Sequence, residues 1–127
     1  MRLRELISLV AVLCWTLLPA QQTAVYTDPL VDYHKAVELF QNKQYLAAQN
    51  LFSNLEQTTS DENMRAECAY YVANCAVRLN QQNADALVER FVNDYPNSIR
   101  RNEAYLEVAD YYFVNGKYAY SSKWYER

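Results

Sequence analysis

The sequence predicts an all-helical fold, a superhelix of about three stacked helix pairs. The 127 residues include one Gly and three Pro, too few for the many turns that a β-sandwich or barrel of this length needs. Hydrophobic residues make up 51% of the chain, which excludes an intrinsically disordered protein. Similar segments also recur at a nearly fixed interval, as expected of a helical repeat.

The recurrence is carried mainly by small and aromatic residues. Two sets of apolar residues are spaced by 37 and then 36 positions: Ala36, Ala73 and Ala109, and Phe40, Val77 and Phe113. Tyr45 and Tyr118 lie two periods apart. Small residues let helices approach closely, and a helix pair buries its apolar face only by stacking on a neighbouring pair. The interval therefore predicts three helix pairs that share one continuous core.

The first 20 residues are predicted to be a secretory signal peptide. Arg2 and Arg4 precede an unbroken, largely apolar run at 6–18, and Pro19 and Ala20 are followed by polar residues. A basic start, a short apolar run and a small residue at the boundary are typical of such a peptide, with cleavage expected near Ala20. The run is shorter than the roughly 20 residues that span a bilayer, which disfavours a membrane anchor. Residues 21–28 then form a linker.

Helix boundaries can be predicted from capping residues. Asp28 followed by Pro29 is typical of a helix start, and we expect helices at 31–41 and 44–57. The Thr-Ser-Asp-Glu sequence at 59–62 predicts a capping box that opens a third helix, which runs to about Asn80. These helices belong to a first unit at 29–60 and a second at 61–97.

The second half of the chain follows the same scheme. Asn83 is predicted to cap a fourth helix that ends near Tyr95, and Pro96 interrupts the chain. A fifth helix ends at 115–116, where Gly116 suits the left-handed position after a helix C-terminus. Lys117 begins a sixth helix, so the third unit at 98–127 is expected to be incomplete.

Helix pairs at this period, with this turn, resemble the tetratricopeptide repeat. The Gly116-x-Tyr118 turn and Tyr125 match the repeat in the third unit, and residues 43–45 match it in the first unit with Lys43 in place of Gly. The second unit matches least, because Gln82 stands at the Tyr position. The segment Phe-Val-Asn-Asp-Tyr-Pro-Asn-Ser at 91–98 is similar to the repeat junction of bacterial envelope members, which include the TolA-binding coordinator of cell division and the repeat lipoprotein of the outer-membrane β-barrel assembly machine.

The resemblance implies a concave groove lined by the first helix of each pair. Tyrosine and aliphatic residues with a few polar groups suit the binding of an extended or helical peptide; alternatively, the tyrosines only cover the inside of a small solenoid. The groove positions carried over from the family recur at 37 and 36 residues: Tyr33, Val37 and Gln41; Tyr70, Asn74 and Arg78; Leu106, Asp110 and Val114.

Composition argues against most enzymatic chemistry. One Gly excludes phosphate-binding loops and the nucleophile elbow, and one His excludes multi-histidine metal sites. We expect His34 to be a surface residue. Cys68 and Cys75 would lie about 10.5 Å apart along one helix, too far for a disulfide, so we expect buried thiols. A net charge of −3 with no basic run disfavours nucleic acid. We therefore expect no enzyme activity, cofactor, metal or small-molecule substrate.

The predicted function is that of an exported, non-catalytic adaptor in the periplasm or at the outer membrane. Its expected partners are other envelope proteins or peptides, with peripheral association with membrane complexes. The last helix has no polar cap helix after it, and Trp124 and Tyr125 are expected to lack a partner on one side. This favours an N-terminal piece of a longer repeat protein. The alternative is the extracytoplasmic sensor portion of a larger membrane signalling or enzymatic protein.

Overall fold

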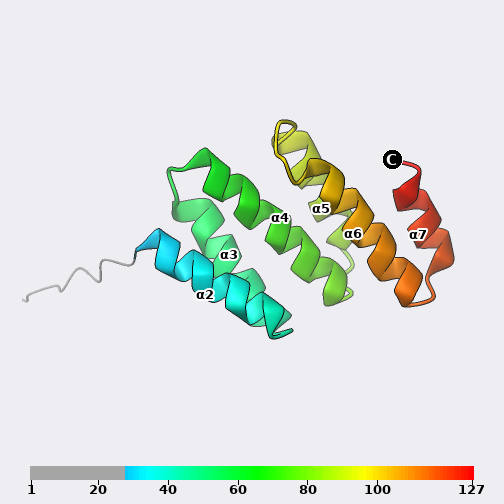
Figure 1. Ribbon diagram of the computed structural model, residues 1–127, viewed down its shortest axis with the longest axis horizontal. Helices are drawn as coiled ribbons and strands as arrows, with labels where there is room; N and C mark the ends of the chain where they lie inside the picture. The colour runs from blue at the N-terminus through cyan, green and yellow to red at the C-terminus, as the bar shows by residue number, and fades with distance from the viewer. Residues whose placement is uncertain (1–27) are drawn as a thin grey trace, which may run out of the picture.

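The computed structural model describes residues 28–127, and this part of the chain is all-helical, with no strand (Figure 1). The predicted signal peptide at 1–20, and the linker up to residue 27, lie outside the described residues. None of the described helices is long and apolar enough to cross a membrane. The helices are α2 (Pro29–Gln41), α3 (Tyr45–Thr58), α4 (Glu62–Arg78), α5 (Ala84–Asp94), α6 (Arg101–Val114) and α7 (Tyr118–Tyr125).

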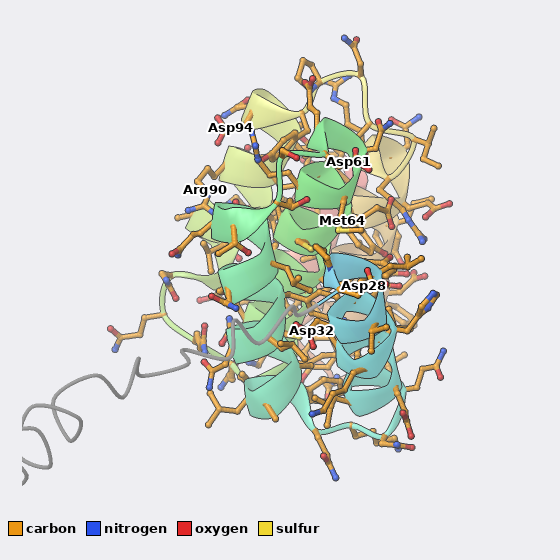
Figure 2. All side chains as sticks on the ribbon, turned by 90° about the vertical axis from the view of Figure 1, so that its left-hand side faces the viewer. Asp28, Asp32, Asp61, Met64, Arg90 and Asp94 are labelled. Atoms are coloured by element: carbon orange, nitrogen blue, oxygen red, sulfur yellow. The ribbon has the colours of Figure 1, made fainter. Side chains whose placement is uncertain are left out.

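The helices form two layers. In Figure 1, α2, α4 and α6 lie side by side at the front, with α3 and α5 behind them and α7 at the far end. The view from the side agrees, with α2 and α3 in separate layers (Figure 2). Each helix packs against the next in the chain, and α4 also contacts α6. The all-helical fold class predicted from the low glycine and proline content is thereby confirmed.

Asp28 and Asp61 begin the helices α2 and α4. The Asp28 carboxylate accepts the backbone N–H of Leu30 at 2.9 Å, and Pro29 follows at the first turn, as predicted. The capping box predicted at 59–62 is wrong, because the cap of α4 is Asp61, which accepts the backbone N–H of Asn63 at 2.9 Å. Thr59 instead ends α3, and its hydroxyl accepts the N–H of Asp61 at 3.2 Å.

The turn between the two helices of each pair has the same backbone structure three times. Lys43, Asn80 and Gly116 adopt left-handed φ angles of 61°, 56° and 74°. In every turn that residue donates its N–H to the carbonyl three positions earlier, and the next residue donates to the carbonyl five positions earlier. This is the paired bonding that commonly ends helices at a left-handed residue. The conformation predicted for Gly116 is confirmed. The left-handed residues of the three turns are spaced by 37 and 36 positions, the same intervals as in the sequence.

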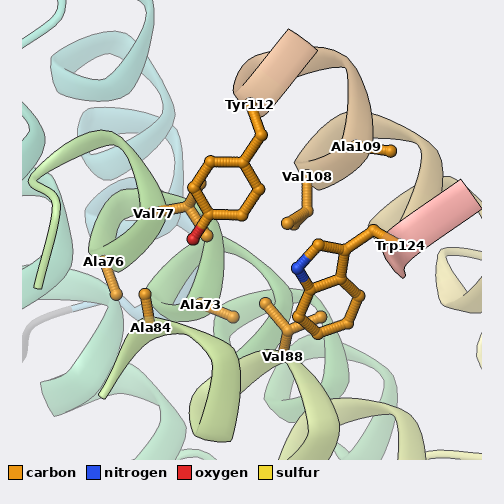
Figure 3. Packing of buried hydrophobic residues seen from close by; sticks show 9 residues of the cluster. All are labelled: Ala73, Ala76, Val77, Ala84, Val88, Val108, Ala109, Tyr112 and Trp124. Atoms are coloured by element: carbon orange, nitrogen blue, oxygen red, sulfur yellow. The ribbon is translucent and has the colours of Figure 1, made fainter. Parts of the chain in front are cut away.

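The buried residues form three clusters, which the partly buried side chains of Tyr71, Leu87 and Tyr105 connect. Ala36, Ala73 and Ala109 are all buried where neighbouring helices meet, as their spacing predicted. Cys68 and Cys75 are buried free thiols, which confirms the sequence-based expectation. The cluster between α4, α5, α6 and α7 is built around an indole and a phenol ring, and its members are Ala73, Ala76, Val77, Ala84, Val88, Val108, Ala109, Tyr112 and Trp124 (Figure 3).

The last helix is better packed than the sequence suggested. Trp124 was expected to lack a partner on one side, and this is wrong, because its side chain is only 1% exposed. Its ring lies between Val88 of α5 and Val108 of α6 (Figure 3). The indole is directed inward from α7, toward the preceding pair. Tyr125, the next residue, is 49% exposed.

Candidate functional site

The nine predicted groove residues come from the three helices of one layer. We call the surface formed by these helices the α2–α4–α6 face. The predicted residues on this face differ in how far they are exposed to solvent. Tyr33, Val37 and Arg78 are half-buried; Tyr70 and Asn74 are buried; Gln41, Leu106, Asp110 and Val114 are exposed.

Tyr70 and Asn74 are not available to a partner in this structure. Their side chains are 2% and 1% exposed. Tyr70 packs edge-on against Phe91 with ring centroids 5.7 Å apart, and the Arg100 guanidinium lies 5.1 Å from its ring centre. The close approach of α6 to α4 covers this strip. Sequence spacing alone placed both residues on the first helix of the second unit without indicating how close the next helix lies.

Arg78 connects all three helices of the face. Its guanidinium lies 4.9 Å from the Phe40 ring centre on α2 and 5.8 Å from the Tyr111 ring centre on α6. It also donates to the Asn74 side-chain oxygen at 2.6 Å, and the Tyr111 hydroxyl donates to the Arg78 carbonyl at 3.3 Å. A planar guanidinium can stack on aromatic rings and hold hydrogen bonds at once. Arg78 therefore fixes the spacing of the helices and presents positive charge on this face.

A second charged cluster lies at the other end of the same helices. Glu67 on α4 accepts the Tyr33 hydroxyl at 3.3 Å and the Arg100 Nε–H at 3.2 Å. Arg100 also donates to Glu103 at 2.9 Å. The sequence analysis did not find Glu67 or Arg100. Arg100 precedes α6 in a connecting segment, so no helical period relates it to Glu67, although the 33-residue separation is close to the repeat interval.

Two tyrosines of the face, Tyr33 and Tyr70, have a raised pKa. Burial raises the pKa of Tyr33 well above that of a free phenol, and the Glu67 carboxylate adds to the effect. Burial likewise raises the pKa of Tyr70, with a contribution from the carboxylate of Glu107. Burial alone would lower the pKa of Arg100, but its bonds to Glu67 and Glu103 outweigh this and raise it. The face consequently carries neutral phenol donors beside a permanent cation.

Apolar side chains cover the α6 end of the face. Leu106 is 55% exposed and Val114 is 82% exposed. Exposed aliphatic groups next to charged and aromatic ones are typical of protein-interaction surfaces. Asp110 lies between them on the same helix and adds negative charge. The arrangement can recognise a peptide or helix with both apolar and charged groups.

His34, Cys68 and Cys75 are the side chains of residues 28–127 whose chemistry the sequence singled out. His34 is exposed on α2 and its nearest aromatic neighbour is Tyr33, with ring centroids 6.0 Å apart. Burial raises the pKa of both the Cys68 and Cys75 thiols to about 12, which is the opposite of an activated nucleophile. No group of three or more metal-ligating side chains is found in this part of the chain.

Comparison of the chain with protein-family models, with curated proteins and with solved structures finds no match.

Proposed function

We propose that this protein is an exported, non-catalytic scaffold of tetratricopeptide-like helix pairs that binds envelope proteins or peptides through its α2–α4–α6 face. The observation that carries the proposal is the composition of that face. Exposed Leu106 and Val114 lie on the same layer as the Arg78 guanidinium and the Glu67–Arg100 pair. Apolar area supplies affinity, and fixed charges supply specificity and orientation.

The repeat assignment is supported by the three turns. Lys43, Asn80 and Gly116 share one left-handed conformation and one bonding pattern at intervals of 37 and 36 residues. Continued stacking of such pairs produces a superhelix with an extended inner surface. Tyr70 and Asn74 are buried, so in this proposal they support the binding face from within and do not contact a partner.

The α6 end of the face is the strongest candidate for direct contact. Leu106 and Val114 are aliphatic residues that remain exposed to water there on residues 28–127. The buried tyrosines and the Arg78 cluster hold α2, α4 and α6 at fixed distances. A rigid layer of helices binds without ordering its own backbone, which lowers the entropic cost of association.

Site-specific photo-crosslinking in living cells tests the face. A photoreactive phenylalanine is placed at Leu106 or Val114, with Leu46 as the matched control, because it is a similarly exposed leucine on α3 in the other layer. We expect Leu106 and Val114 to give the same crosslinked envelope proteins, and Leu46 to give none of them. Identical products from all three positions, or none from Leu106 and Val114, would refute the assignment of the face.

Export is proposed from the sequence at 1–20 and has its own test. Cells are fractionated, and the protein is detected with an antibody to residues 28–127 and its N-terminus determined by mass spectrometry. The proposal predicts a periplasmic or outer-membrane-associated protein that begins near Gln21. An intact Met1 in the cytoplasmic fraction would contradict it, whatever the outcome of crosslinking.

A further inference from the structure

A cavity of about 380 Å³ lies between the second and third helix pairs, where two turns come side by side. The turns join α4 to α5 and α6 to α7, and both lie at the lower edge of the stack in Figure 1. The lining comes from these turns, from the first turns of α5 and α7 and from the last turn of α6. Its side chains include Asn80, Gln82, Asp85, Tyr112, Lys117 and Tyr120.

The cavity belongs to the junction between the two pairs. Tyr120 lies one helical turn before Trp124, whose indole packs toward α5, so both side chains lie on the same side of α7. The centre of the Tyr120 ring is 5.6 Å from that of Tyr112, and the Tyr112 hydroxyl donates to Asp85 of α5 at 3.1 Å. All of the lining residues lie between positions 80 and 120. The site is therefore defined by the second and third pairs themselves.

The cavity also lies apart from the surface on which one pair receives the next. In the first pair, Phe40 and Tyr45 are covered by the following helix, α4, through the Arg78 guanidinium. Their counterparts 73 residues later, Phe113 and Tyr118, do not line the cavity. A helix that packed on the third pair in the same way would leave the cavity unfilled.

The junction between the first and second pairs lacks this lining. Three of its alanines, each at most 2% exposed, are replaced by larger residues at intervals of 37, 36 and 36 positions. A stack can thus be closed with methyl groups at these positions, so packing alone does not require a carboxylate and two phenols there. The replacements are Ala48 by Asp85, Ala76 by Tyr112 and Ala84 by Tyr120.

The polar groups of the cavity combine donors and acceptors. Lys117 donates to the Asn80 side chain and lies over the Tyr112 ring, with Nζ 5.7 Å from the ring centre. The Asp85 carboxylate accepts the Tyr112 hydroxyl and lies 3.6 Å from Nζ of Lys123. Each charge therefore already has a partner within the protein. A neutral ligand whose groups both donate and accept suits this mixture better than a single strong charge does.

Tyr120 supplies an apolar platform beside these groups. Its side chain is 55% exposed, and its ring plane makes an angle of 40° with that of Tyr112. The exposed Gln82 adds an amide, which can donate and accept. A sugar has the complementary structure, because its ring carries apolar C–H groups on one face and a rim of hydroxyls that donate and accept.

We propose that this cavity binds a saccharide, with one sugar ring stacked on Tyr120 and its hydroxyls bonded to Asp85, Lys117 and Gln82. The volume is at the small end of the roughly 300–1,000 Å³ that is typical of ligand sites, which fits a short saccharide. None of the nine predicted groove residues lines the cavity. The site goes beyond the proposed function and does not rest on it.

Binding is tested on the purified full chain with neutral oligosaccharides that differ in linkage: chitotetraose, cellotetraose and maltotetraose. Saturation-transfer NMR detects the bound sugar, and titration calorimetry gives its Kd. Tyr120→Ala removes the platform, Tyr120→Phe keeps it, and Gln82→Ala removes the amide. The matched control is Tyr118→Ala, because Tyr118 is also an exposed tyrosine of α7 but lies outside the cavity. Circular dichroism and urea midpoints verify that each variant is folded.

We expect saturable binding of at least one of these sugars, with a Kd of about 1 mM or lower. Tyr120→Ala is expected to weaken binding about fivefold or more and Gln82→Ala about threefold, while Tyr120→Phe and Tyr118→Ala stay within about twofold of the unaltered protein. The proposal is overturned if none of the sugars binds at up to about 10 mM. It is equally overturned if Tyr120→Ala leaves the affinity unchanged, or weakens it no more than Tyr118→Ala does.

Discussion

Lys43 and Gly116 occupy the same left-handed backbone position in equivalent turns 73 residues apart, with φ angles of 61° and 74°. Only one of them is glycine. A side chain in this conformation brings Cβ close to the backbone and costs about 1 kcal/mol relative to glycine. A Cβ added at Gly116 would meet nothing within 4 Å, so the cost there is confined to the backbone.

The two turns therefore predict opposite effects from reciprocal substitutions. Lys43→Gly is expected to stabilise the protein by about 0.5–1 kcal/mol, and Gly116→Ala is expected to destabilise it by about 1 kcal/mol. Urea unfolding followed by circular dichroism measures both. A destabilising Lys43→Gly would mean that the lysine side chain makes a contact that outweighs its backbone conformation.

Gln49 and Gln81 form a reciprocal amide pair that joins α3 to the turn after α4. Each donates to the other, at 3.0 and 2.8 Å, and Gln49 also donates to the Val72 carbonyl at 3.2 Å. Because Gln49 is buried, Gln49→Ala is expected to cost about 1–3 kcal/mol of unfolding free energy. Gln81→Ala should cost less, since Gln81 is only partly buried.

A double-mutant cycle isolates this pair. We expect a coupling energy of about 0.5–3 kcal/mol between Gln49→Ala and Gln81→Ala. Gln57→Ala, at an exposed position of α3, is the control and should couple to neither. Strictly additive effects of the two substitutions would show that the amide pair contributes nothing beyond packing.

The buried thiols make stability depend on alkaline pH. Burial raises the pKa of Cys68 and of Cys75 from 9.0 to about 12. The folded state therefore holds these protons more tightly than the unfolded state, so the contribution to stability is complete below pH 9. It is lost progressively as pH rises from about 9 to 12. The pKa of Tyr112 is raised from 10.0 to about 12, mainly by burial and secondly by Asp85, so its contribution to stability is lost between about pH 10 and 12.

Urea midpoints measured between pH 7 and 11 test this dependence. We expect a fall above pH 9 that is shallower in the Cys68→Ala, Cys75→Ala double variant. The native thiols should also resist alkylation at pH 8 and react only after unfolding. Rapid alkylation of the folded protein would contradict the burial of both groups.

Trp124 is expected to contribute most to the attachment of α7. Its side chain fills the space between α5 and α6, so Trp124→Ala should cost about 3–5 kcal/mol. That is a large share of the roughly 5–15 kcal/mol of a typical domain. The control is Tyr120→Ala on the same helix, an exposed position where a change within about 1 kcal/mol is expected. Thermal unfolding by calorimetry compares the two, and equal losses would contradict the packing.

Much of the helical order could be predicted from the sequence because its causes are local. The Asp28–Pro29 start and the left-handed turn at Gly116 depend only on neighbouring residues, and both predictions are confirmed. The capping box at 59–62 was wrong because two local patterns competed there. Thr59 already ends α3, so the nearer carboxylate of Asp61 caps α4.

Which residues of the candidate site are exposed depends on the distances between helices, and the sequence predicted this exposure less well. Periodicity placed Tyr70 and Asn74 on the correct helix, but both are buried, and it could not find the Glu67–Arg100 pair. The sequence by itself determined the all-helical class, the left-handed turn at Gly116 and the burial of the small residues Ala36, Ala73 and Ala109, because backbone sterics and side-chain size act within a few residues. Only the tertiary structure decided which tyrosines reach the surface and where Trp124 packs. Those outcomes depend on how closely α4, α6 and α7 approach, and that distance is a property of the whole stack.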